Sequence, residues 1–215
     1  MTAKFDATAF QAETGVSAMT MARLEAFETS LREWNETMNL VSPASLEDLW
    51  MRHMLDSAQV APLIPVDTRT IIDFGSGAGF PGLVIAALRA PGVGVETILI
   101  ESIEKKCAFL RAAVDAMGLG DSVTVLRGRA EDLPPRPADV ITARAVASLD
   151  LLLGYAQRYV GRKTLCLFLK GKTAGEELTA ARQSWKIMAD MIPSRTDPAS
   201  SIIAIRSFTA KGRRS

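Results

Sequence analysis

Residues 71–82 read IIDFGSGAGFPG, and this stretch decides the fold. An apolar run ends in an acidic and an aromatic residue, a glycine-dense turn follows, and a proline can then open a helix. Glycine has no Cβ atom, so it adopts positive φ readily and lets a ligand approach the backbone closely. A turn of this kind after a first parallel strand is typical of α/β proteins that bind nucleotide-like cofactors.

The glycine spacing argues against a dinucleotide. The dinucleotide fingerprint is G-x-G-x-x-G, and Phe80 stands where its third glycine would fall. S-adenosylmethionine carries no phosphate, and its carboxylate, ammonium and ribose suit a tight turn with carboxylates nearby. A turn with no ligand is the alternative, but five Gly or Pro residues between Gly75 and Gly82 exceed the one or two that turns usually need. The spacing therefore favours S-adenosylmethionine.

Strands and helices are predicted to alternate from residue 70 onward. Such alternation indicates an α/β, Rossmann-like fold with a mostly parallel seven-stranded sheet and helices on both faces. The carboxyl-end loops then share one edge of the sheet, where ligands bind. The expected strands are 70–74, 96–100, 122–126, 139–143, 164–169, 186–192 and 201–208, and the expected helices are 81–89, 103–117, 149–159 and 174–182.

Residues 1–68 are predicted to form a helical extension of the domain over 69–215, the two making one compact unit. Apolar residues recur at helical spacing over 17–38. A second helix is expected near 45–60, with Ser45 and Asp48 as a start resembling a capping box. A short helix is expected before Gly15.

Composition excludes several classes of protein. The 215 residues are 48% hydrophobic and 23% charged, which is ordinary for a globular chain, and no apolar run reaches the ~18 residues of a membrane span. Cys107 and Cys166 lie in apolar segments, so we expect reduced core thiols in a cytoplasmic protein, with a disulfide as the alternative. His53 is the only histidine, which argues against zinc and against a Ser-His-Asp triad.

Charge is distributed unevenly along the chain. Residues 1–68 contain four Lys or Arg and ten Asp or Glu, whereas residues 69–215 contain 21 and 14. A basic segment of this kind fits a polyanion such as RNA. Solvated surface charge explains it equally well.

Candidate ligand groups follow four of the strands. Glu101 can accept hydrogen bonds from ribose hydroxyls, or it can serve the start of the next helix. Residues 128–132 offer an amide and a carboxylate for an adenine edge, or another polar helix start. Arg144 can hold a carboxylate or a phosphate. Lys170 can contact a phosphate or begin a basic helix.

Several motifs together resemble the bacterial small-subunit ribosomal RNA guanine-N7 methyltransferases, also called the glucose-inhibited division protein B family. The glycine motif is general to methyltransferases, and the flanking motifs narrow the match. They run in order over residues 31–171: Trp34-Asn35, Asn39-Leu40, Arg52-His53, Asp56-Ser57, Asp73 to Gly82, Glu101, Lys105-Lys106, Phe109-Leu110, Gly128 to Glu131, Arg144-Ala145 and Lys170-Gly171.

This resemblance implies a class I S-adenosylmethionine-dependent methyltransferase. The acceptor it implies is N7 of one guanine, nucleotide 527 of 16S ribosomal RNA in the small subunit. No metal and no second copy of the chain are implied. The implied cofactor residues are Gly75, Gly77, Gly79, Phe80, Glu101, Ala130, Glu131 and Arg144, and the RNA-binding candidates are Arg52, His53, Arg129 and Lys170.

Two other functions stay open at this point. One is a methyltransferase that acts on a small molecule or a protein. The other is a non-catalytic module that binds the cofactor and associates with the ribosome. Guanine N7 has a lone pair and no proton, so the leading function needs no general base, and the sequence identifies no proton-transfer catalyst.

Overall fold

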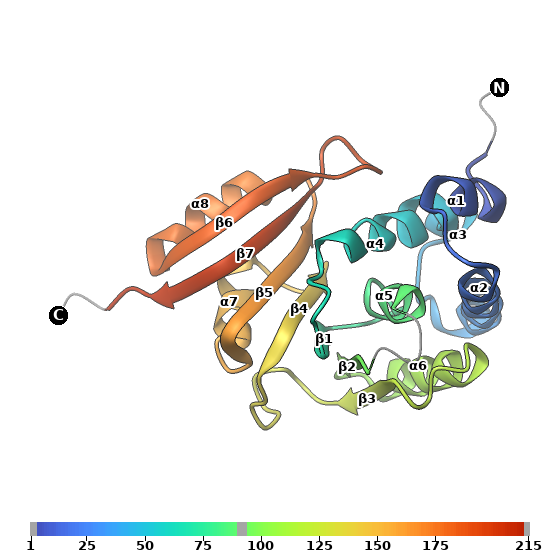
Figure 1. Ribbon diagram of the computed structural model, residues 1–215, viewed down its shortest axis with the longest axis horizontal. Helices are drawn as coiled ribbons and strands as arrows, with labels where there is room; N and C mark the ends of the chain where they lie inside the picture. Colours follow the sequence, from blue (N-terminus) through green and yellow to red (C-terminus); the bar gives the residue numbers. More distant parts are fainter. Residues whose placement is uncertain (1–3, 90–93, 213–215) are drawn as a thin grey trace.

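A seven-stranded sheet forms the centre of the computed structural model, which describes residues 4–89 and 94–212 (Figure 1). Its strand order is β3-β2-β1-β4-β5-β7-β6. The first five strands in this order are parallel, and β7 runs antiparallel to both β5 and β6. The strands are β1 (Thr70–Phe74), β2 (Glu96–Glu101), β3 (Val123–Arg127), β4 (Ala138–Arg144), β5 (Val160–Lys170), β6 (Trp185–Pro193) and β7 (Ser201–Ala210).

The predicted fold class is confirmed, with small differences at the ends of elements. The helices after β1 are α5 (Gly82–Leu88), α6 (Glu104–Ala116), α7 (Leu149–Ala156) and α8 (Ala174–Ser184). The largest difference is β5, which begins at Val160 rather than at residue 164. Its first four residues are exposed, and only Val160 among them pairs with β4 before the register shifts, so no apolar alternation marks them in the sequence.

Helices cover both faces of the sheet. α7 and α8 bury one face, which includes Ile72 and Phe74 of β1. The opposite face packs against α5 and the segment before β1, with Ile71 and Ile85 in the same cluster. Because successive residues of a strand point to opposite faces, the continuous apolar run of β1 serves both layers.

The N-terminal part is a set of helices on the side of the molecule away from β6 (Figure 1). It comprises α1 (Ala7–Thr14), α2 (Ala18–Met38), α3 (Pro43–Glu47), the π-helix η1 (Trp50–Leu55), α4 (Asp56–Ala58) and the 3₁₀ turn η2 (Ala61–Leu63). Phe27 of α2 lies in the same core cluster as Phe80 and Phe109. We therefore propose that residues 1–68 and 69–215 fold as one unit.

The prediction for the helix near residues 45–60 was wrong in detail. The chain forms three short helices there, and the N-cap of the first is Ser42, whose Oγ accepts a hydrogen bond from Ser45 N at 3.2 Å. Pro43 fits the first helical position because its missing N–H would have no helical partner there. The predicted helices before Gly15 and over 17–38 are confirmed as α1 and α2.

Three smaller expectations concern cysteines, membrane spans and metal sites. Cys107 and Cys166 are both free and buried. None of the described helices has the length and apolar character of a membrane span. Within the same residues, no cluster of three or more His, Cys, Asp or Glu side chains could hold a metal ion.

Candidate functional site

The glycine turn between β1 and α5 has a backbone conformation that glycine permits. Gly75, Gly77 and Gly79 have φ values of 60°, 53° and 89°, in the region that disfavours residues with a Cβ atom. A Cβ atom at Gly75 would lie 2.6 Å from a Val146 methyl group, and one at Gly79 would lie 2.6 Å from Leu83. The backbone conformation therefore favours glycine at all three positions, and a Cβ atom would also be crowded at two of them.

Glu101, the last residue of β2, holds this turn. Its Oε2 accepts a hydrogen bond from Gly77 N at 3.0 Å, and its Oε1 accepts one from Ile103 N at 2.8 Å. The second contact is the helix-start role that the sequence left open. The residue is 5% exposed. A carboxylate has about four acceptor positions, so Glu101 keeps capacity for further donors such as ribose hydroxyls.

Asp73 is a buried carboxyl group next to the turn, and the sequence reading gave it no role. Its Oδ1 accepts a hydrogen bond from the Thr142 hydroxyl at 2.6 Å, while Oδ2 makes none within the described part of the chain. A Cβ atom at Gly82 would meet Oδ2 at 2.9 Å, so α5 begins directly against this carboxyl. Burial raises the pKa of Asp73 to about 6, although the hydrogen bond from Thr142 opposes that shift.

A pocket of about 230 Å³ lies beside the glycine turn, at the carboxyl ends of β1 to β4. Its walls bring together strand ends that are far apart in the sequence. Ala130 is buried and its carbonyl accepts a hydrogen bond from the Tyr159 hydroxyl at 2.6 Å. The lining residues are Phe74, Gly75, Ile100, Ser102, Gly128, Arg129, Ala130, Glu131, Val146, Ala147 and Tyr155.

Phe80 packs inward instead of lining this pocket. It is 3% exposed. Its ring stacks on His53 with centroids 4.8 Å apart and meets the Phe27 ring at a tilt of 45° with centroids 5.0 Å apart. Burial, together with Arg144 and Arg52 nearby, lowers the pKa of His53 to about 3. The imidazole is therefore neutral at physiological pH, and neither of its nitrogens has a hydrogen-bond partner among the described residues.

Arg144 connects the end of β4 to the N-terminal helices. Its Cζ atom lies 5.0 Å from the centroid of the Phe80 ring, a cation–π distance. Its Nη1 donates to the Arg52 carbonyl and to Asp56 Oδ2, both at 3.3 Å. Burial lowers the pKa of Arg144, and Asp56 opposes that shift. Asp56 Oδ1 also accepts from Thr196 in the β6–β7 loop, so one carboxylate links three parts of the molecule.

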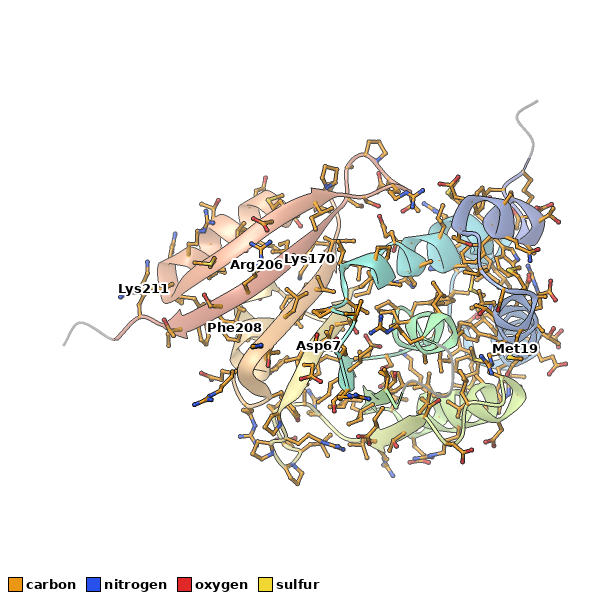
Figure 2. All side chains as sticks on the ribbon, in the orientation of Figure 1. Met19, Asp67, Lys170, Arg206, Phe208 and Lys211 are labelled. Atoms are coloured by element: carbon orange, nitrogen blue, oxygen red, sulfur yellow. The ribbon has the colours of Figure 1, made fainter. Side chains whose placement is uncertain are left out.

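The four RNA-binding candidates differ in exposure. Arg52 and Arg129 are exposed, His53 is half-buried, and the Lys170 side chain is only 7% exposed. Figure 2 shows Lys170 on β5, close to the end where that strand pairs with the start of β7. Its ammonium group donates to Glu177 and to a backbone carbonyl, so it does not point into solvent as Arg52 and Arg129 do.

Sequence reasoning missed the loop that closes the pocket. Val146 and Ala147 line the pocket, and Ala145 before them has a φ of +56°. Small apolar residues at a strand end carry no motif, and a positive φ at alanine has no signature in the sequence. The glycine spacing and Glu101, in contrast, were recognisable because each has a specific chemical requirement.

The chain matches one protein family over most of its length. The model of the GidB family, described as rRNA small subunit methyltransferase G, matches residues 20–200. Curated relatives with the name ribosomal RNA small subunit methyltransferase G include one from Rhodospirillum centenum, 47% identical over 97% of this chain and 94% of the relative. Another, from Caulobacter vibrioides, is 40% identical over 95% of this chain and 93% of the relative.

Solved structures with more distant sequences share the fold. An O-methyltransferase from Bacillus cereus in complex with SAH has a TM-score of 0.58 and 16% identity, covering 85% of this chain and 91% of the other. A SAM-dependent methyltransferase from Aquifex aeolicus has a TM-score of 0.56 and 15% identity, covering 84% and 97%. The fold thus agrees with the family match, and the chain belongs to the rRNA small subunit methyltransferase G family.

Proposed function

We propose that this chain transfers the methyl group of S-adenosylmethionine to N7 of a guanine in 16S ribosomal RNA, nucleotide 527. One observation carries the proposal in addition to family membership. The glycine turn at the end of β1 is held by the buried Glu101 carboxylate beside a pocket formed by four strand ends. That arrangement lies where α/β proteins bind cofactors.

The residues present fit this cofactor. We assign the open backbone around Gly77, where a Cβ atom would meet nothing closer than 3.6 Å, to the amino-acid part of the donor. Glu101 is assigned to the ribose hydroxyls. Ala130 and Glu131, at the far wall of the pocket, are assigned to the adenine. Phe80 packs inward, so we assign it a supporting role, in which its ring lies against the Arg144 guanidinium.

The proposed reaction requires no proton transfer by the protein. When bound, S-adenosylmethionine supplies an electrophilic methyl group on a positively charged sulfonium. Transfer to guanine N7 would form a bond to its lone pair as the methyl–sulfur bond breaks, which would leave a neutral thioether and no proton to remove. The residues that hold donor and acceptor would therefore act by alignment, which can contribute ~7–11 kcal/mol.

The RNA contacts are assigned to two exposed basic residues, of which Arg129 lines the pocket. Arg52 and Arg129 are exposed and can reach phosphates. The target guanine has to leave its stack to present N7 to the methyl group. Because the acceptor is ribosomal RNA, we place the enzyme in the cytoplasm, and the proposed reaction requires a single copy of the chain.

The test is methyl transfer to defined RNA. Labelled S-adenosylmethionine is incubated with small subunits or 16S RNA lacking the modification, and the methylated nucleotide is mapped. We expect one label per RNA, at N7 of the proposed guanine. A matched RNA with 7-deazaguanine at that nucleotide keeps the Watson–Crick edge but replaces N7 with carbon, so it should accept no methyl group.

Three results would contradict the proposal. Label on a small molecule or protein in preference to RNA would support the first rival function. Cofactor binding without methyl transfer to any form of the RNA would support a non-catalytic module. Transfer to the 7-deazaguanine RNA would show that N7 is not the acceptor atom.

A further inference from the structure

The loop Ala145–Ser148, between β4 and α7, forms one wall of the cofactor pocket. Val146 and Ala147 line the pocket together with Gly75 of the glycine turn, and a Val146 methyl group lies so close to Gly75 that a Cβ atom there would clash. Ala145 has a φ of +56°, a conformation that costs an alanine ~1–2 kcal/mol. Such a conformation persists only when the surroundings hold it.

An ion pair from two other elements holds this loop. Lys170 at the end of β5 donates from Nζ to the Ala147 carbonyl at 2.5 Å and to Glu177 Oε2 at 2.8 Å. The same Glu177 oxygen accepts a hydrogen bond from Leu149 N at 2.8 Å. One lysine and one glutamate thus fix the backbone on both sides of Ser148, where the loop becomes α7.

Burial and charge indicate that the ion pair between Lys170 and Glu177 is strong. The Lys170 side chain is 7% exposed and that of Glu177 is 24% exposed. Partial burial disfavours the charged form of Glu177, but hydrogen bonds from Lys170 and Leu149 still lower the pKa of its carboxyl below the ordinary value. Charge-assisted hydrogen bonds are roughly twice as strong as neutral ones, so loss of either partner should free the loop.

We infer that Lys170 and Glu177 are positioning residues, which set the wall of the cofactor pocket by fixing the backbone of Ala147 and Leu149. The inference rests on the proposed function only in that this pocket holds S-adenosylmethionine. It departs from the prediction that Lys170 contacts RNA. The two roles predict opposite results, because a positioning lysine affects the cofactor and a phosphate contact affects RNA binding and its salt dependence.

The experiment compares Lys170→Met with Lys172→Met. The first replaces a buried ammonium with an apolar chain of similar length and leaves Glu177 accepting from Leu149 and Thr173. The second changes an exposed lysine two residues away. Calorimetry should give a dissociation constant for S-adenosylmethionine about tenfold higher in Lys170→Met and unchanged in Lys172→Met. RNA affinity without cofactor, and its slope against salt, should be the same in Lys170→Met as in the wild type.

A Glu177→Gln variant provides a second measurement if Lys170→Met does not fold. Gln keeps an acceptor for Leu149 N but loses the negative charge, so we expect a smaller rise in the same dissociation constant. Unchanged cofactor affinity in the folded variants, or a reduced salt slope for RNA in Lys170→Met, would overturn the inference. Because the readout is cofactor binding, a wild-type protein that binds cofactor without methylating RNA would refute the proposed function alone. A wild type that binds no cofactor would refute both.

Discussion

Pockets lie at both ends of the parallel strands, and volume does not distinguish the one beside the glycine turn. The amino-end pocket has a volume of about 450 Å³, against about 230 Å³ for the pocket beside the turn. A further pocket of about 690 Å³ lies at the carboxyl ends of β4 and β5. The residues that line the amino-end pocket, of which Asp67 and Arg206 are labelled in Figure 2, are Pro65, Asp67, Thr68, Asp139, Lys163, Thr164, Leu165 and Arg206. Volume alone therefore does not select the pocket beside the glycine turn.

The polar groups at the two ends serve different purposes. At the amino end, Asp139 Oδ2 accepts hydrogen bonds from Arg69 N and Thr70 N at 2.7 and 2.9 Å, which ties the start of β1 to β4. Arg206 pairs with Asp190, and both are exposed. At the carboxyl end, the buried Glu101 holds a turn in a conformation that favours glycine. Strained backbone next to a buried carboxylate indicates a binding site better than volume does.

The largest effect is expected for Gly77→Val. A β-branched residue does not tolerate a φ of 53°, and its side chain would fill the space left open above the turn. Binding of S-adenosylmethionine, measured by calorimetry, should be lost. Gly118→Val is the matched control, because Gly118 has a φ of 62° and open space around it in the turn after α6. Gly118→Val should lower stability and leave cofactor affinity unchanged. Normal affinity in Gly77→Val would refute the placement of the cofactor.

A smaller effect is expected for Arg144→Ala. The change removes hydrogen bonds to Asp56 and to the Arg52 carbonyl and the contact with Phe80. Hydrogen bonds of charged groups contribute about 1.5–3 kcal/mol, so kcat/KM for methyl transfer should fall about tenfold to a hundredfold. The matched change at the amino end is Arg136→Ala, which breaks an exposed ion pair with Glu96. Equal activity in the two variants would remove Arg144 from the site.

The sequence predicted the architecture well because its signals are local. Each strand has an apolar run, and the glycine turn has a chemical requirement that can be recognised within twelve residues. Contacts between distant segments were not predictable in the same way. Asp56 meets Thr196 across 140 residues of chain, and Lys170 meets the Ala147 carbonyl across 23.

The site was predicted less completely than the fold, for a related reason. Residue type showed that Glu101 could bind ribose and that Lys170 could bind phosphate, but it could not show which charges the fold would bury. In the folded protein, the Phe80 ring lies beneath Arg144. Lys170 is buried and forms an ion pair with Glu177. The position of Phe80 depends on the distant end of β4, and that of Lys170 depends on the loop after β4, whose Ala147 carbonyl accepts a hydrogen bond from Nζ.

The pH dependence of stability should show the cost of burial at the carboxyl end. The pKa of His53 is about 3 in the fold and about 6.5 in the unfolded chain. As pH falls below 6.5, the unfolded chain binds a proton that the folded protein rejects, so stability falls. Between pH 7.5 and pH 5 the loss from this residue should be about 2 kcal/mol. Urea denaturation at both pH values should show that His53→Phe avoids this loss. An equal loss in wild type and variant would place the cause elsewhere.

The smallest effect is expected at the amino-end pocket, where Lys163→Ala and Arg206→Ala can be combined. Lys163 is exposed, and so are both partners of the ion pair between Arg206 and Asp190. Each of the two basic residues therefore contributes at most about 1 kcal/mol to stability. The double variant should keep wild-type affinity for S-adenosylmethionine and wild-type kcat for methyl transfer. Its RNA affinity reports whether this end of the sheet touches the ribosome. A tenfold loss of cofactor affinity would mean that the amino-end pocket takes part in cofactor binding, and strained backbone would then not identify the site in this protein.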